Sequence, residues 1–185
     1  MIKKLLIGVA IVFGVLTTCM VLIVWMVAST NKPKGNREEI LQSNQQLPKK
    51  ALIVYQPAIT DITSRMAHQI AKGLNDGGYE VTLNYPGEHL STDISQYSLI
   101  VFGSPAYGGN PLSIVTDYMS RIKDFSSKRI VLYSTGANPD SLLELDNMEK
   151  FLNSTKAHKK IKFFVSANKE NDKIAYDLGK ELSKE

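Results

Sequence analysis

Three uninterrupted apolar runs constrain the fold of this chain more than any other feature. They are Ala51-Leu52-Ile53-Val54-Tyr55, Leu99-Ile100-Val101-Phe102 and Ile130-Val131-Leu132-Tyr133. A strand without polar alternation has both faces covered, which is typical of the interior of a parallel sheet with helices on each side. The segments Tyr79–Leu83 and Lys160–Phe163 instead alternate, so we expect them at the edges of the same sheet.

Between these strands, apolar residues recur at helical spacing. The predicted helices are marked by Ile62, Met66, Ile70 and Leu74; by Leu112, Val115, Met119 and Ile122; by Leu145, Met148 and Leu152; and by Ile174, Leu178 and Leu182. Strands that alternate with helices predict an α/β domain built on a doubly wound, five-stranded parallel sheet. With the two alternating segments at the edges, the strand order is 2-1-3-4-5, numbered along the chain.

The first 30 residues have a different character. No charged residue occurs from Leu5 to Ala28, and this run is longer than the roughly 20 residues that cross a bilayer as a helix. The run also exceeds the roughly 7 to 15 apolar residues of a cleaved signal peptide. Leu16-Thr17-Thr18-Cys19 loosely resembles a lipoprotein cleavage site, but the residues after Cys19 stay apolar, which argues against cleavage there. We therefore expect residues 1–30 to be an uncleaved transmembrane anchor that contacts the lipid bilayer through residues 5–28.

Residues 31–48 are polar, and we interpret them as a linker in which Ile40 and Leu41 could form only a short helix. Residues 49–185 are then long enough for one core and too short for two domains. Cys19 is the single cysteine of the sequence and lies in the predicted anchor. The rest of the chain therefore has no disulfide framework, thiol nucleophile or cysteine metal site.

A candidate binding loop follows the second apolar run. The chain continues as Gly103-Ser104-Pro105-Ala106-Tyr107-Gly108-Gly109-Asn110. Gly108 and Gly109 lack the side chains that would keep a flat ligand away from the backbone, and Tyr107 offers a ring on which such a ligand could stack. The alternative is a tight strand-to-helix turn with an incidental tyrosine.

This stretch resembles the second flavin-binding loop of the flavodoxin family, and the resemblance extends from about Lys49 to the C-terminus. It implies an FMN cofactor at the carboxyl ends of the strands. In the second loop the resemblance implies that the flavin ring is contacted by Ser104, Pro105, Ala106, Tyr107, Gly108, Gly109 and Asn110. In the loop Ser134–Asp140 it implies backbone contacts from Thr135, Gly136 and Ala137.

The loop Gln56–Ser64 holds the position of the family's phosphate loop, but only Thr60 and Thr63 match its usual Thr-Gly-Asn-Thr ending. Asp61 and Ile62 stand where Gly and Asn are expected. A carboxylate repels a phosphate unless its side chain turns away or caps the helix. Two interpretations stay open: a working phosphate loop, or a helix start that Thr60 or Asp61 merely caps.

The resemblance implies electron or hydride transfer through the flavin, by an FMN-dependent oxidoreductase or an electron-transfer protein, without a separate set of catalytic residues. His68, His89 and His158 are interpreted as surface or packing residues, and neither a dinucleotide fingerprint nor a Walker loop occurs. The alternative is a degenerate flavodoxin fold that serves as a binding or regulatory module without flavin.

Charge and the anchor suggest where such a protein acts. Residues 49–185 contain nearly equal numbers of acidic and basic residues. Soluble electron carriers of the flavodoxin family instead have an acidic surface, which steers them to basic partners. We therefore expect a quinone or a membrane redox protein as partner, and no nucleic acid. Lys32, Lys34 and Arg37 outnumber the basic residues before the anchor, which places the domain on the cytoplasmic side of the cell membrane.

Overall fold

The computed structural model describes residues 2–138 and 140–185, so Met1 of the predicted anchor and Pro139 of the predicted third loop lie outside the described residues. Along the chain the elements are α1 (Ile2–Thr30), β1 (Glu39–Leu41), β2 (Lys50–Tyr55), α2 (Ile62–Asp76), β3 (Glu80–Asn84), β4 (Leu99–Tyr107), β5 (Asn110–Pro111), α3 (Ser113–Arg121), β6 (Arg129–Gly136), α4 (Leu143–Glu149), β7 (Lys159–Phe164) and α5 (Asn168–Ser183).

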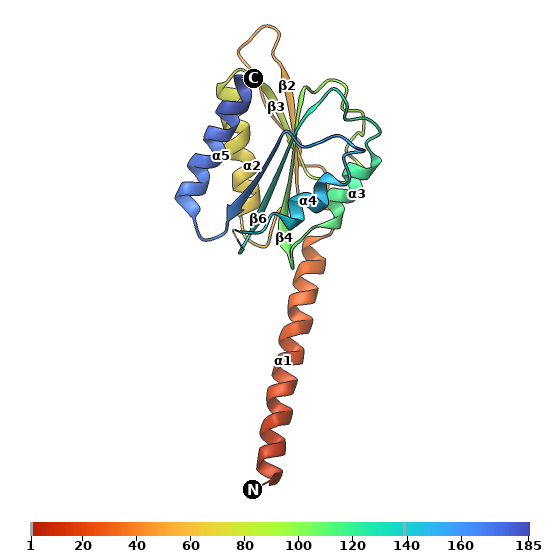
Figure 1. Cartoon of the computed structure of the whole chain (residues 1–185), viewed down its shortest axis with the longest axis vertical. Helices are drawn as coiled ribbons and strands as arrows, with labels where there is room; N and C mark the ends of the chain where they lie inside the picture. Colours follow the sequence, from red (N-terminus) through yellow and green to blue (C-terminus); the bar gives the residue numbers. More distant parts are fainter. Residues whose placement is uncertain (1, 139) are drawn as a thin grey trace.

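The sheet has the order β1-β3-β2-β4-β6-β7, and β5 pairs with β4. The strands β3-β2-β4-β6-β7 are parallel to one another, which confirms the predicted doubly wound sheet and its order 2-1-3-4-5. Helices α2 and α5 cover one face, and α3 and α4 cover the other (Figure 1). We call the end at which the parallel strands finish the carboxyl edge, and the other end the amino edge.

The apolar runs lie in the interior strands because both of their faces are packed. In β2, Ala51 and Ile53 contribute to the core beneath α2 and α5, whereas Leu52 and Val54 contribute to the core beneath α3 and α4. The side chains of a strand point alternately to its two faces, so a strand with two cores needs apolar residues throughout.

Two glycines let α2 and α5 pack closely. A Cβ added at Gly179 would lie 2.3 Å from the Ile70 carbonyl oxygen, and one added at Gly73 would lie 2.2 Å from the Tyr176 carbonyl oxygen. Both neighbours are backbone atoms, which cannot move aside as a side chain can. The sequence therefore requires glycine at this helix crossing for steric reasons.

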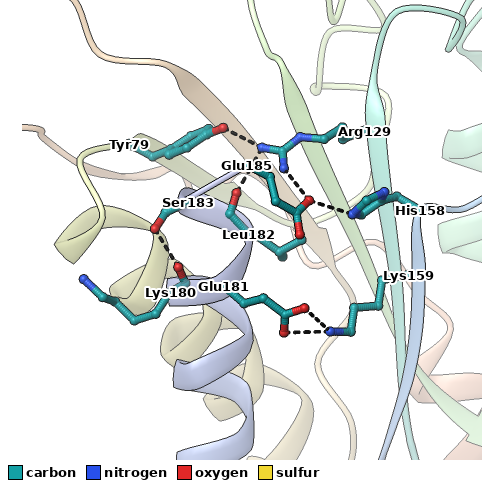
Figure 2. A network of polar contacts seen from close by, with 9 residues as sticks. All are labelled: Tyr79, Arg129, His158, Lys159, Lys180, Glu181, Leu182, Ser183 and Glu185. Carbon is teal, nitrogen blue, oxygen red and sulfur yellow. Dashed lines mark hydrogen bonds and ion pairs between the residues drawn. The ribbon is translucent and has the colours of Figure 1, made fainter.

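Polar contacts at the amino edge fasten the end of α5 to the sheet (Figure 2). The Glu185 carboxylate accepts from Arg129 at 2.9 Å and pairs with His158 at 2.8 Å, and Arg129 also donates to the hydroxyl of Tyr79. Partial burial raises the pKa of Glu185, but its hydrogen bond with Arg129 and its pairing with His158 lower that pKa further, to below its ordinary value. This network holds the C-terminus far from the candidate site.

Two short antiparallel strands were not expected from the sequence. Strand β1 comes from residues 31–48 and pairs with the outer edge of β3, with Ile40 opposite Thr82. The short helix suggested around Ile40 and Leu41 is therefore wrong. An exposed strand edge has unpaired amides and carbonyls, and β1 satisfies those of β3.

Helix α1 projects away from the rest of the molecule, from the end toward which the arrowheads of the parallel strands point (Figure 1). Among the described residues, Gly8–Thr30 is the one helix long and apolar enough to cross a membrane; an 18-residue stretch of it has a mean hydropathy of 2.5 and contains no buried residue. Its apolar side chains thus face the surroundings all round.

Candidate cofactor site at the carboxyl edge

Three loops meet at the carboxyl edge, where the strand order reverses between β2 and β4 and where ligands bind in open α/β sheets. We call residues 56–61 loop one, residues 104–112 loop two and residues 136–142 loop three. The hydroxyl of Tyr107 in loop two accepts a long hydrogen bond of 3.4 Å from the Ile59 amide in loop one. The Thr63 and Thr135 hydroxyls are 2.7 Å apart, which joins the start of α2 to the end of β6.

Loop two is a two-residue β-hairpin between β4 and β5. Tyr107 pairs with Asn110, and Gly108 and Gly109 both have positive φ, at 60° and 75°. A tight hairpin of this kind requires positive φ at both central positions, so the glycines are needed for the turn itself. A Cβ added at Gly108 would also meet nothing within 4 Å, which leaves open space beside the backbone.

The other residues of loop two differ in their accessibility. Ser104 is fully buried, and its hydroxyl donates to the Pro105 carbonyl and accepts from the Leu112 amide, so it holds the loop's own shape. Pro105 is buried, whereas Ala106 and Tyr107 are partly exposed. Tyr107 is thus the aromatic side chain of this loop that a ligand can reach.

Loop one leads into α2, and Asp61 stands at the start of that helix without capping it through its side chain. The Asp61 carboxylate turns instead to Arg65, at 3.1 Å. Arg65 also pairs with Asp172, at 2.7 Å, so this one cation only partly offsets the negative charge that would repel a phosphate. Thr60 is exposed, but Thr63 is fully buried with its hydroxyl directed to Thr135. Of the two matching threonines, only Thr60 is exposed to solvent.

The end of β6 and loop three lie at the same edge. Thr135 and Gly136 are buried, and Ala137 is exposed. A Cβ added at Gly136 would lie 3.2 Å from Cε of Lys162 and 3.5 Å from Cβ of Ala106. Glycine at this position of β6 therefore leaves room for the side chains of the neighbouring strands β7 and β4. The structure therefore brings the candidate residues of loops two and three into one region.

A buried ion pair beneath loop three was missed by the sequence reasoning. Lys162 contacts the Glu144 carboxylate at 2.7 Å, with side chains only 6% and 0% exposed, and Ser134 donates to the same oxygen at 2.6 Å. Burial raises the pKa of Glu144, but the hydrogen bonds from Lys162 and Ser134 lower it further, to below its ordinary value. Lys162 also donates to the Ser141 carbonyl, so the pair fixes loop three to β7.

Gln56 is a second residue that the sequence did not single out. Its side-chain amide is buried and donates to the carbonyls of Thr30, at 2.6 Å, and Lys32, at 2.9 Å. On the other side of this junction, Asn31 donates to the Ser113 hydroxyl and accepts from the Ile114 amide. The end of α1 is therefore held between loop one and the start of α3.

Tyr133 in β6 holds the start of α2 next to the site. It is fully buried, and its hydroxyl donates to the Thr63 carbonyl at 2.9 Å. Gly103, its neighbour in β4, leaves the room for this ring, since an added Cβ would lie 2.0 Å from the Tyr133 ring carbon Cζ. Burial raises the pKa of the Tyr133 hydroxyl well above its ordinary value, so it stays protonated and acts as a donor.

No protein-family model matches this chain, and no curated protein matches its sequence. Solved structures do match. A Streptococcus pneumoniae flavodoxin aligns with 73% of this chain and 98% of its own, at 19% identity and a TM-score of 0.61. The two-electron reduced Megasphaera elsdenii flavodoxin aligns with 73% of this chain and 99% of its own, at 22% identity and a TM-score of 0.58.

A metal-soaked flavodiiron core from Synechocystis aligns over 77% of this chain at 18% identity and a TM-score of 0.63, but this chain covers only 36% of that longer protein. Among the described residues, no group of three His, Cys, Asp or Glu side chains could hold a metal ion. At such identities the likeness concerns the fold: this chain has a flavodoxin-like α/β fold with an apolar N-terminal helix.

Proposed function

We propose that this protein is a membrane-anchored electron carrier that binds FMN at the carboxyl edge of its sheet. The observation that carries the proposal is the meeting of loops one, two and three at the strand-order reversal, with the partly exposed Tyr107 beside the open glycine hairpin. The match of this fold to nearly the full length of two flavodoxins supports it.

The residues at this edge fit the ring of a flavin better than its phosphate. Tyr107 offers a stacking surface, and the backbone of Gly108, Gly109 and Ala137 is accessible to ring atoms. At the phosphate end, the amino terminus of α2 and the Thr60 hydroxyl are the groups that favour an anion. When bound, FMN supplies the redox chemistry, while the chain positions the ring and limits its contact with water.

A second candidate function is a flavin-free binding or regulatory module. Two observations favour it: the Ile59 amide already donates to Tyr107, and the Thr63 hydroxyl is sequestered by Thr135. Both groups belong to the segment that would hold a phosphate. The two candidates differ in whether Tyr107 moves off the Ile59 amide to admit a ligand.

The anchor and its orientation complete the proposal. Helix α1 crosses the cell membrane once, and the domain lies on the cytoplasmic side, next to the basic residues Lys32, Lys34 and Arg37. The partner is then a quinone or a membrane redox protein, because an anchored carrier meets partners that share its membrane.

The test is the visible absorption of the full chain purified in detergent, followed by titration of the flavin-free protein with FMN and riboflavin. We expect bound flavin, with similar affinities for the two ligands because loop one contributes little to phosphate binding. Failure to bind either ligand would refute the flavin proposal and favour the module. A strong preference for FMN would show instead that loop one binds the phosphate despite Asp61.

A further inference from the structure

Apolar side chains are exposed on several loops of the carboxyl edge. Ile59 follows β2, Leu142 and Leu143 lie at the start of α4, and Val165 follows β7, with exposed fractions of 53%, 44%, 54% and 38%. We call these four residues the edge patch. The carboxyl ends of parallel strands share one end of the sheet, so the edge patch surrounds the candidate cofactor site.

Helix α1 leaves the domain from this same edge (Figure 1). Its last residue, Thr30, accepts from Gln56 in loop one, and Asn31 bonds Ser113 and Ile114 at the start of α3. The apolar run ends at Ala28, so only about 3 Å of helix rise separates it from Thr30, the residue held by Gln56. A bilayer that contains α1 therefore lies directly against the carboxyl edge.

We propose that the edge patch rests on the surface of the phospholipid bilayer, at the boundary between headgroups and acyl chains. This inference rests on the proposed anchoring through α1. A bilayer fits this surface because apolar side chains gain by leaving water at that boundary. The exposed Lys32 and Lys34, next to the end of α1, suit the anionic headgroups beside it.

One consequence concerns the partner of the candidate site. With the edge patch on the bilayer, loops two and three face the membrane and the amino edge faces the aqueous phase. A soluble protein cannot then reach Tyr107 from the water side without lifting the domain. A lipid-soluble redox compound that reaches the headgroup region can approach it directly.

The test places an environment-sensitive fluorophore on the full chain in phospholipid vesicles. In a Cys19→Ser background, single cysteines are introduced by Leu142→Cys, by Val165→Cys and, as the matched control, by Leu47→Cys. Leu47 is also an exposed apolar side chain, at 94%, but it precedes β2 at the amino edge. Vesicles with and without nitroxide-labelled lipid then report contact with the membrane. Brominated lipid reports whether Trp25 of α1 is embedded.

We expect nitroxide lipid to quench the labels at positions 142 and 165 at least threefold more than the label at 47, with Trp25 quenched in every variant. If Trp25 is quenched but position 142 behaves like position 47, the edge-patch inference is overturned while the anchor stands. If Trp25 is not quenched, the anchor fails and the inference fails with it. Quenching at 142 by added FMN but not by labelled lipid would assign the patch to the cofactor and overturn the inference.

Discussion

Replacing Lys162 by methionine tests the energetics of the buried ion pair beneath loop three. The substitution keeps most of the side-chain volume but leaves the fully buried Glu144 carboxylate with Ser134 as its remaining hydrogen-bond donor among the described side chains. Removing one partner of a buried pair costs about 3–5 kcal/mol, because the other charge stays buried without compensation. That is a large share of the roughly 5–15 kcal/mol that stabilises an ordinary domain.

The pH dependence gives an independent check of the same pair. The pKa of Glu144 is lowered in the folded protein, so the pair stabilises the fold above the ordinary carboxyl pKa, and this stabilisation is lost as the pH falls through the lowered value. In Lys162→Met, burial acts on Glu144 without the lysine and raises its pKa. The stability deficit of the variant should therefore shrink as the pH falls.

The assay is urea unfolding of the full chain in detergent, followed by far-UV circular dichroism. The control is Lys173→Met, which removes the exposed pair with Asp177, whose side chains are 78% and 53% exposed, and should change stability by less than about 1 kcal/mol. Glu144→Leu combined with Lys162→Met should regain most of the loss. A cost for Lys162→Met no larger than that of the control would refute the reasoning.

Three further predictions concern single residues. Tyr107→Ala should weaken flavin binding by about fivefold or more, since stacking contributes on the order of 1 kcal/mol, with unchanged unfolding; equal affinity in a fluorescence titration would remove Tyr107 from the site. Gly179→Ala should lower the unfolding free energy by about 2 kcal/mol or more, because its Cβ would lie 2.3 Å from the Ile70 carbonyl; an unchanged urea midpoint would argue against this close helix contact. Gln56→Ala should release the end of α1 and speed trypsin cleavage after Lys34; cleavage at the wild-type rate would mean that Gln56 does not hold the junction.

The sequence predicted the sheet well because each strand carries its own signal. Continuous apolar runs identified β2, β4 and β6 as interior strands, and alternation placed the other two parallel strands outside them. The expected edge position is wrong for β3, because β1 pairs with its outer side, and of these two only β7 is an edge strand. Strand β1 was not predicted because Ile40 and Leu41 lie among polar residues. Their pairing with β3 also connects segments that are far apart in the chain. Local patterns do not report such contacts.

The site was only partly visible in the sequence for a similar reason. The loop with Gly108 and Gly109 was recognised from its residues, but the hairpin that it forms with β5 was not, and the resemblance identified the three loops. The local pattern did not single out Glu144 as part of the site, although its carboxylate binds Ser134 and Lys162. Lys162 belongs to a strand that alternates polar and apolar residues, so the pattern alone suggested that it faces solvent.

We propose that FMN binds among the three loops of the carboxyl edge. The most direct measurement is the change in backbone amide chemical shifts of the full chain in detergent as FMN is added. We expect large shifts at Ile59, Gly108, Gly109 and Ala137, and none at Gly78 on the amino edge. Unchanged shifts in the three loops, or shifts centred on Gly78, would contradict it.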